Sequence, residues 1–397
     1  MLAAPRQDRF ESLDVLRGVA VLAIFAVNIQ AMALPAAMFA NPSLNTEYFD
    51  ASGQKLWSFV STFIQFKFIT IFSALFGAGI ILMVGEEKPS EKFGVHYKRM
   101  IWLLLFGLIH AFVIWFGDIL TPYAVAGMIV VLARRWRPGT LFIVGFVLIA
   151  LAFLFQASMH LAPEDAREAM VKQMWSPPPE VIAHEIERYT SPLWERLPDT
   201  AGNAILFQLV QTIMLGPRNI GVMMIGMALF KLGFFTAAWP MMRYLVFGAV
   251  TLAIGGGASA YATAEFFRNE FEMFSLFNGQ AALYWGSLPQ AFGYAALVMA
   301  LCKIPTLGLL RAPFAAAGRM ALSNYLACSL IGAFLYYGPP GLGLMGSASY
   351  VDLAKTVGAV WVATLIWSPV WLSIFRFGPF EWLWRSLTYG RPQPLLK

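Results

Sequence analysis

Residues 57–84 read WSFVSTFIQFKFITIFSALFGAGIILMV, a run in which Lys67 is the one charged side chain. The hydrocarbon core of a bilayer is about 30 Å thick, and an α-helix crosses it with about 20 apolar residues. This run is long enough to do so. It therefore predicts a helix that spans a membrane, and comparable segments continue on both sides of it.

Ten apolar segments emerge when the chain is divided at clusters of charged residues, proline and glycine. The predicted spans are 15–38, 57–84, 98–116, 118–134, 139–160, 204–231, 237–264, 281–303, 318–338 and 354–376. They predict an all-α fold, a polytopic transmembrane bundle of about ten helices. We expect residues 1–397 to form a single membrane domain.

The composition agrees with a membrane protein. Hydrophobic residues make up 59% of the chain and charged residues only 13%, whereas soluble globular domains have about 25% charged residues. The mean hydropathy of +0.64 comes from the whole chain, which excludes a signal peptide or a single anchor as its source. Cys302 and Cys328 lie in separate apolar stretches and indicate neither a disulfide framework nor a metal cluster.

The net charge of +6 could suggest nucleic acid, but excess Lys and Arg in a membrane protein marks cytoplasmic loops. We expect no nucleic-acid partner, and membrane lipids as the surroundings. The basic residues cluster at alternate ends of the predicted spans. They are Arg6, Arg9, Lys88, Lys92, Lys98, Arg99, Arg134, Arg135, Arg137, Lys303, Arg311, Arg376, Arg385, Arg391 and Lys397. This pattern predicts a bacterial inner-membrane protein with both termini in the cytoplasm.

Two hydrophilic regions follow from this orientation. Residues 162–200 are predicted to lie outside the cell, where they either cap a substrate entrance or form a solvated connector. Residues 377–397 are predicted to be a cytoplasmic tail. The third and ninth loops, the latter at 338–350, contain no Lys or Arg and also belong outside.

Two polar residues are predicted near the middle of the bilayer. His110 lies in an apolar run (LFGLIHA, 105–111) eleven residues after Arg99, and Asn28 lies eleven residues after Arg17. Each is therefore about 16 Å along its helix from the cytoplasmic side. Polar groups at this depth are costly and usually face a cavity or a partner. His110 is a candidate general base or nucleophile; alternatively, it hydrogen-bonds to a neighbouring helix.

Asp118 follows in the run WFGDIL (115–120). Gly117 suits the end of a helix and Asp118 the N-cap of the next one, which is a structural role. The same position also places a carboxylate at the outer mouth of a cavity above His110. Along a straight helix the two residues would be about 12 Å apart, so their pairing requires the chain to fold back.

Four arginines lie at or near the predicted cytoplasmic boundary: Arg17, Arg99, Arg319 and Arg385. Individually they suit anchoring to lipid phosphate. Together they suit a phosphate-bearing donor, because a guanidinium group can donate two parallel hydrogen bonds to phosphate oxygens. Asn324 and Tyr325 add hydrogen-bonding groups to the ninth span as candidate substrate contacts.

Several familiar signatures are absent from the sequence: a Walker motif, an HExxH pair, a GxSxG elbow and a CxxCH motif. ATP hydrolysis, zinc proteolysis, serine hydrolysis and covalent haem therefore lack support. His96, His160 and His184 are predicted in or near loops without metal-ligand spacing. We expect no metal and no tightly bound cofactor.

Two sets of motifs carry a resemblance to a family. The first is LDVLRGVA (13–20) with the LFGLIHA and WFGDIL runs, and the second is GRMALSNY (318–325) with GPFEWLWR (378–385). Together they resemble the YeiB-like proteins that contain a DUF418 domain. The resemblance covers essentially the whole chain.

That family is similar to a wider group of transmembrane acyltransferases, which includes heparan-alpha-glucosaminide acetyltransferase and the acyltransferase-3 proteins. The resemblance implies transfer of an acyl group from cytoplasmic acyl-CoA to a hydroxyl or amine of an envelope glycan, lipid or small molecule. Acyltransferase-3 proteins carry a histidine at the position of Asn28. The asparagine of this chain resembles the heparan-type branch instead. His110 is then the deep histidine left for the chemistry.

Two hypotheses follow. In the first, the four arginines bind acyl-CoA, His110 deprotonates the acceptor or carries the acyl group, and Asn28 or Tyr325 polarises the thioester carbonyl. In the second, the protein is a transporter or lipid-handling protein in which His110 and Asp118 form a proton or substrate pathway. A nucleotide site at the arginines favours the first, and a continuous polar path the second.

Overall fold

The computed structural model describes residues 10–86 and 91–397. Arg6, Arg9 and Lys88, which contribute to the charge pattern, lie outside the described residues. Within them the chain is helical between short loops, and the one β feature is an isolated bridge between Phe375 and Leu396. The all-α prediction is confirmed.

The helices follow one another in a single series. In chain order they are α1 (Glu11–Ala33), α2 (Ala36–Ala40), η1 (Pro42–Leu44), α3 (Ala51–Phe63), α4 (Lys67–Val84), α5 (Glu91–Ile109), η2 (His110–Ile114), α6 (Leu120–Val130), η3 (Val131–Ala133), α7 (Pro138–Ser158), η4 (Met159–Leu161), α8 (Glu164–Met170), η5 (Val171–Trp175), α9 (Pro179–Thr190), α10 (Leu193–Val210), η6 (Gln211–Leu215), α11 (Gly216–Lys231), α12 (Met241–Arg268), η7 (Met273–Leu276), α13 (Phe277–Cys302), η8 (Pro305–Leu307), α14 (Gly308–Arg319), α15 (Ala321–Tyr336), α16 (Tyr350–Ile374) and α17 (Pro379–Tyr389).

Every predicted span overlaps one of these helices, but the figure of ten is approximate. In the described residues, seven helices are long and apolar enough to cross a membrane, and an eighth span is possible if the bent pair Met273–Cys302 and Pro305–Arg319 counts as one. Two shorter apolar helices, Leu120–Ala133 and Ala321–Tyr336, complete the predicted set. The protein is thus a polytopic helical membrane protein.

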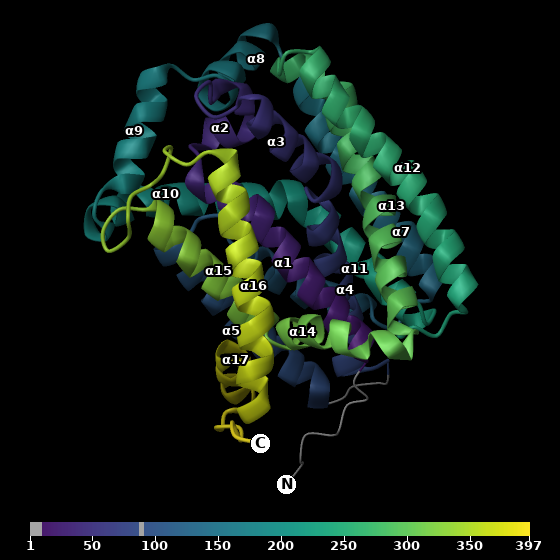
Figure 1. Cartoon of the computed structure of the whole chain (residues 1–397). Helices are drawn as coiled ribbons and strands as arrows, with labels where there is room; N and C mark the ends of the chain where they lie inside the picture. Colours follow the sequence, from purple (N-terminus) through teal and green to yellow (C-terminus); the bar gives the residue numbers. More distant parts are fainter. Residues whose placement is uncertain (1–9, 87–90) are drawn as a thin grey trace.

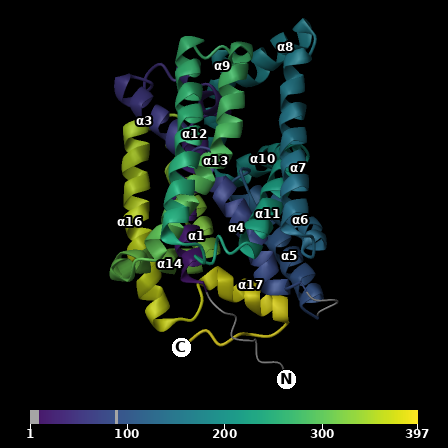
Figure 2. The same ribbon diagram turned by 90° about the vertical axis from the view of Figure 1, so that its right-hand side faces the viewer.

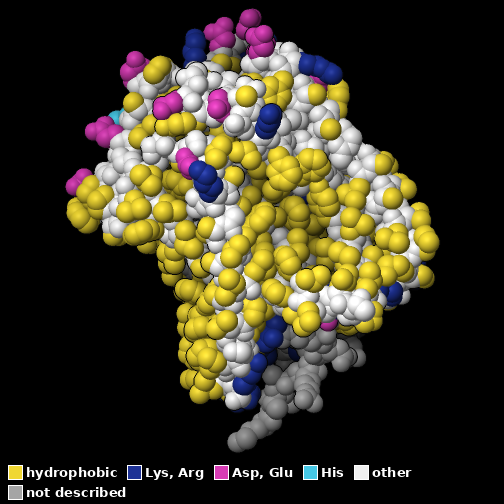
Figure 3. Space-filling model, viewed as in Figure 1, with side chains coloured by type: hydrophobic (Ala, Val, Ile, Leu, Met, Phe, Trp, Pro, Cys, Tyr) yellow, Lys and Arg dark blue, Asp and Glu magenta, His cyan; other side chains and the backbone are white. Residues whose placement is uncertain are grey.

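The long helices stand roughly side by side, with α1 and α4 inside the bundle and α12, α13 and α16 towards its outside (Figures 1 and 2). Helices α8 and α9 cover one end, while α14 and α17 lie near the other. The space-filling view shows a broad hydrophobic surface between these ends, with acidic side chains gathered at the end that carries α8 and α9 (Figure 3). An apolar belt of this kind suits contact with lipid tails.

Helices α1 and α14 cross at two glycines. A Cβ atom on Gly18 would overlap the carbonyl oxygen of Phe314, and a Cβ on Gly318 would overlap the carbonyl oxygen of Asp14. Small residues at such crossings let two helix backbones approach closely in a membrane. This contact holds Arg17 and Arg319, one residue from each glycine, at the same end of the bundle.

We expect Gly318→Ala to lower the free energy of unfolding by about 1–3 kcal/mol, because the added methyl group meets rigid backbone. Gly256→Ala is the matched control, since a Cβ at Gly256 in α12 has no heavy atom within 4 Å. Thermal unfolding of the purified protein measures both. Equal midpoints for the two variants would contradict the tight crossing.

The two hydrophilic regions are more ordered than a connector and a tail. The end of α9 pairs with the loop after α15, because Gly338 N donates to Tyr189 O at 2.8 Å and Leu193 N to Pro339 O at 2.9 Å. Tyr189 is buried. This contact attaches the region to the bundle, and its role as a cap over a substrate entrance stays a prediction. At the other end of the bundle, α17 packs on α5, where Trp384 Nε1 donates to Arg99 O at 2.8 Å.

Candidate functional site

A cavity of about 470 Å³ lies among α1, α4, α5, α6, α14, α15 and α17. All four predicted donor-site arginines line it: Arg17, Arg99, Arg319 and Arg385. They come from four different helices or their ends, so the fold gathers them from across the sequence. Arg17 and Arg99 thus face a shared cavity.

Arg99 and Arg385 contribute positive charge that no described carboxylate neutralises at ion-pair distance. The Arg99 guanidinium lies 4.0 Å from the ring centroid of Trp384 and its Nη1 lies 2.9 Å from Met83 Sδ. Arg385 lies over the ring of Tyr389, 5.6 Å from its centroid. A cation held against an aromatic face keeps other N–H groups free for an anion.

The other two arginines are tied more closely to the protein. Arg17 Nη1 pairs with Asp14 Oδ1 at 3.2 Å, and Arg319 Nη2 donates to Arg376 O at 3.4 Å. Arg17 and Asp14 are one helical turn apart on α1. Opposite charges at this spacing meet on one helix face, so Asp14 fixes the direction of Arg17 towards the cavity.

Glu381 is the second carboxylate in the cavity wall. It accepts hydrogen bonds from Leu322 N at 2.7 Å, from Ser323 N at 3.1 Å and from the Ser323 hydroxyl. These bonds satisfy donors at the start of α15. Burial raises the pKa of Glu381, and its hydrogen bonds oppose that rise. Glu381 thus joins α17 to α15 and fixes one wall.

His110 and Asp118 form a buried pair at the far end of α5. His110 Nδ1 lies 3.1 Å from Asp118 Oδ1, and both side chains are completely buried. This contact is at ion-pair distance but lacks hydrogen-bond geometry, and Nε2 has no hydrogen-bond partner in the part of the chain described. An imidazole with a carboxylate at one nitrogen and the other nitrogen unengaged is suited to general-base chemistry.

The pair forms because the chain folds back after α5, as the spacing required. The helix widens into the π-turn η2, where Trp115 N donates to His110 O at 2.9 Å. Gly107 then makes room for the returning chain, since a Cβ there would overlap Asp118 Oδ2 and the Thr121 backbone nitrogen. The group that approaches Gly107 most closely from the returning chain therefore includes Asp118 itself.

Asp118 also has the predicted capping role. Its Oδ1 accepts from Leu120 N at 3.0 Å and its Oδ2 from Thr121 N at 2.7 Å, at the start of α6. Gln208 of α10 fixes the same loop, because its Nε2 donates to Phe116 O at 3.0 Å and to Asp118 O at 3.2 Å. The carboxylate is therefore held rigidly beside the imidazole.

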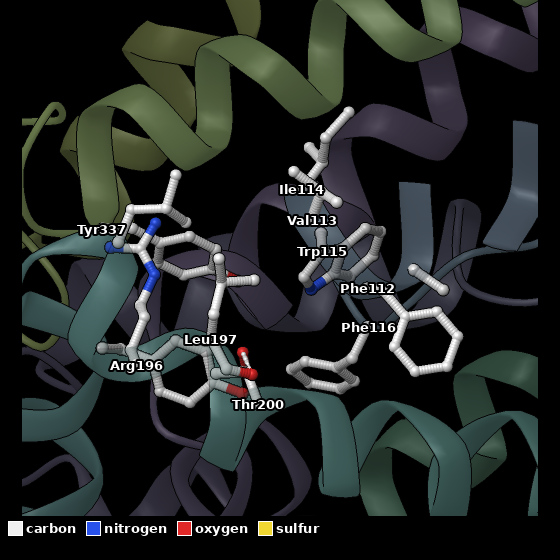
Figure 4. A pocket seen from close by; sticks show the side chains of 12 residues that line it. Phe112, Val113, Ile114, Trp115, Phe116, Arg196, Leu197, Thr200 and Tyr337 are labelled. Carbon is white, nitrogen blue, oxygen red and sulfur yellow. Dashed lines mark hydrogen bonds between the residues drawn. The ribbon is translucent and has the colours of Figure 1, made fainter. Parts of the chain in front are cut away.

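His110 lies between two hollows. On one side, the Tyr325 ring is 5.1 Å from the imidazole by ring centroids, and Tyr325 lines the large cavity. On the other, the Trp115 ring is 6.4 Å away and lines a pocket of about 20 Å³. This small pocket has room for about one water. Trp115, Arg196, Thr200 and Tyr337 surround it (Figure 4).

Several predicted site residues lie elsewhere. His110 itself lines neither of these two hollows, so its place on an internal cavity stays a prediction. Asn28 lies outside the cavity wall. So does Asn324, whose Nδ2 donates to Ala317 O at 2.9 Å and whose Oδ1 accepts from Trp367 Nε1 at 2.9 Å. Asn324 thus connects α15 to α14 and α16.

His96 and Trp384 line the cavity and were not predicted to do so. His96 is buried in α5, not in a loop, and its Nε2 lies 3.0 Å from Gly127 O. A signal was present, because His96 precedes His110 by fourteen residues, close to four helical turns, and so shares its helix face. Trp384 gives no comparable signal.

A metal site was neither predicted nor indicated by the structure. Across residues 10–86 and 91–397, no group of three His, Cys, Asp or Glu side chains is arranged to hold a metal ion.

Comparisons with known proteins agree with the resemblance seen in the motifs. Residues 229–391 match the family described as "Protein of unknown function (DUF418)", a range that includes Tyr325 and Arg385 but not His110. The chain is 31% identical to "Uncharacterized protein YeiB" of Escherichia coli (strain K12), with 98% of each chain covered. It is 30% identical to "Uncharacterized protein YxaH" of Bacillus subtilis (strain 168), covering 98% of this chain and 96% of that one. The protein belongs to the YeiB-like DUF418 family.

Proposed function

We propose that this protein is a transmembrane acyltransferase, which moves an acyl group from acyl-CoA to a hydroxyl or amine acceptor at the membrane or cell envelope. The observation that carries the proposal is the position of the His110–Asp118 pair behind a cavity lined by four arginines. The cavity offers charge for a phosphate-bearing donor, and the pair offers a base at its inner end.

The charged and aromatic side chains of the cavity suit the donor. Two arginines without a carboxylate partner stand beside Trp384 and Tyr389, whose faces suit stacking on a nucleotide base. Tyr325 lies at the inner end of the cavity, where its hydroxyl oxygen accepts a hydrogen bond from Ile119 N at 3.3 Å. The same hydroxyl group can donate its proton to the donor molecule. The donor's phosphates would lie at the arginines and its thioester would reach towards Tyr325.

The reaction then needs one proton transfer in each direction. His110 Nε2 takes the proton of the acceptor hydroxyl or amine as the acceptor atom attacks the thioester carbonyl. The C–S bond breaks when the tetrahedral intermediate collapses, and the departing CoA sulfur takes the proton from His110. Asp118 stabilises the imidazolium between these steps, and the Tyr325 hydroxyl is the candidate donor to the developing oxyanion. Entry of the reactants requires His110 to become accessible, because it is closed off in this conformation.

The alternative, a transporter or lipid-handling protein with His110 and Asp118 in a pathway, has less support. The lining of the large cavity and that of the small pocket share no residue, so the two hollows are separate. His110 lies between these hollows and lines neither, so neither hollow supports a pathway that runs through it.

We also place the protein in a bacterial inner membrane with both termini in the cytoplasm. The argument is the positive-inside pattern of the sequence, together with the arginine-lined cavity at the end of the bundle that carries Arg17 and α17. Under this orientation the cavity opens towards cytoplasmic acyl-CoA.

Binding of CoA to the purified protein tests the donor site. We expect Arg99→Gln and Arg385→Gln each to weaken CoA binding by about tenfold or more, because each loses a charged hydrogen bond to phosphate. Arg243→Gln is the control, since Arg243 is exposed at the start of α12 away from the cavity. Calorimetric titration with CoA and with dephospho-CoA measures the change.

The opposite result of the CoA titrations would contradict the donor site. If wild-type protein binds no CoA, or if the two cavity variants bind it as well as wild type does, the arginines are not a donor site. The acyl-CoA assignment would then be withdrawn.

A further inference from the structure

Arg218 is a second, separate cationic site, buried within the membrane-spanning region of α10, η6 and α11. The side chain is 4% exposed and lies thirteen residues before Lys231, which is about 20 Å along the helix. Lys231 ends that helix at the basic side of the bundle, where it pairs with Glu86 at 2.9 Å. Arg218 therefore lies well inside the apolar belt.

The partners of Arg218 are neutral. Its Nη2 donates to the hydroxyls of Thr70 and Ser287, each at 3.0 Å. Its guanidinium carbon lies 5.1 Å from the centroid of Tyr284 and 5.8 Å from that of Phe66. Its Nε is buried without a hydrogen-bond partner, and no described carboxylate lies within ion-pair distance. An arginine stays protonated at any physiological pH, so a full positive charge is left uncompensated.

The surrounding backbone is interrupted at the same place. Helices α3 and α4 are separated at residues 64–66, where Phe66 takes the left-handed conformation with φ of 66°. Beside it, η6 is a π-turn that leads into α11 at Gly216 and Pro217. Irregular backbone at membrane depth is tolerated where protein or a cavity shields it. In discontinuous membrane helices, the N-termini of the half-helices also point at bound anions.

A second buried base starts α4. Lys67 is completely buried, and its Nζ donates to Ser61 O at 2.7 Å. Thr70, which binds Arg218, lies one turn further along the same helix. The first turn of α4 thus carries one cation and contacts another, and helix N-termini favour negative charge. An arginine keeps its proton even in such surroundings.

Phe66 connects this site with the lipid. Its ring faces Arg218 and is itself 38% exposed, and the neighbouring Phe63 is 45% exposed. The buried guanidinium is therefore separated from the membrane side of the bundle by one partly exposed aromatic ring. An amphiphile could place its polar head at Arg218 while its tail stays in the bilayer.

We propose that Arg218 binds a carboxylate group, either the head of a long-chain acid from the bilayer or a small free acid. Arg218 cannot lose its positive charge by deprotonation, so one negative charge is needed to balance it. A carboxylate accepts strong charge-assisted hydrogen bonds from a guanidinium, and here Nε is the donor without a partner. The Thr70 and Ser287 hydroxyls accept from Nη2 and donate to Phe66 O and Tyr284 O, so they hold the guanidinium in place beside the bound group. This site is distinct from the arginine cavity, whose lining does not include Arg218.

Thermal unfolding of the full chain in phosphatidylcholine nanodiscs tests the proposal, with palmitate, hexadecanol or sodium acetate added. Palmitate and acetate share the carboxylate, whereas hexadecanol shares only the chain. We expect palmitate to raise the wild-type midpoint by several degrees and hexadecanol not to, because a ligand stabilises the folded state it binds. Arg218→Met should remove the shift, and Arg243→Met, at an exposed arginine of α12, should keep it.

The acetate arm identifies the source: a shift with acetate indicates a small free acid, and a shift with palmitate alone indicates an acid from the bilayer. Equal shifts with palmitate and hexadecanol, or an unchanged palmitate shift in Arg218→Met, would overturn the proposal. If Arg218→Met fails to fold, radiolabelled palmitate binding to wild type decides. Saturable binding of about one molecule per chain, displaced by excess palmitate and not by hexadecanol, supports a carboxylate site; unsaturable partitioning overturns it.

Discussion

His110→Gln should lower the rate of acyl transfer by about 10²- to 10⁴-fold, the contribution typical of a general acid–base group. Glutamine keeps a hydrogen-bonding group of similar reach but can neither take up a proton near neutral pH nor form an acyl intermediate. The loss should appear in kcat. CoA binding should change little, because His110 does not line the arginine cavity.

The measurement compares turnover of the variant with that of wild type in nanodiscs, after equal membrane insertion and thermal stability have been established. His184→Gln is the matched control, since His184 is exposed on α9. A folded His110→Gln protein with wild-type turnover would reduce His110 to a structural residue. CoA binding would then stand alone, and the reaction would need another base.

Most of the fold could be predicted because the membrane simplifies the problem. A span must be long, apolar and helical, so segments such as 354–376 stand out in the sequence as the helix α16 does in the structure. The number of spans was less accessible. α6 and α15 are shorter than a full crossing, and α13 bends by 103° into α14, which hydropathy alone cannot resolve.

The cavity arginines could be predicted because Lys and Arg collect at the cytoplasmic ends of membrane spans. The aromatic side chain of Trp384 in the cavity wall could not be predicted. Trp384 belongs to an amphipathic helix that was expected to be a tail, and its place beside Arg99 depends on packing between residues far apart in the chain. Asn28 and Asn324 were recognised as polar residues within spans, but that position does not reveal which helix face meets the cavity.

The His110–Asp118 contact shows the limit most directly. Spacing along a helix gave about 12 Å and left pairing dependent on a fold-back. The π-turn η2 provides that fold-back. No residue pattern in the sequence predicts a π-turn at this place. Gly107 was the available hint, since its missing side chain is where Asp118 now lies.

Asp118→Asn should lower kcat by about 10²-fold or more while leaving the stability close to that of wild type. Asparagine caps a helix as well as aspartate does, so the bonds to Leu120 N and Thr121 N can persist. What the variant loses is the negative charge beside His110 Nδ1. Without it the imidazolium formed during proton transfer is unsupported, and the ring is free to adopt the wrong tautomer.

Asp118→Ala separates this positioning role from capping. It removes both the charge and the cap, so it should be as inactive as Asp118→Asn but less stable by about 1 kcal/mol. If Asp118 were only a cap, the asparagine variant would have full activity and the alanine variant alone would fail. Measuring kcat, KM for acyl-CoA and the unfolding midpoint of both variants therefore distinguishes the two roles. A kcat loss shared by both variants, with KM unchanged and stability lost only in Asp118→Ala, assigns the charge of Asp118 to the chemistry of His110.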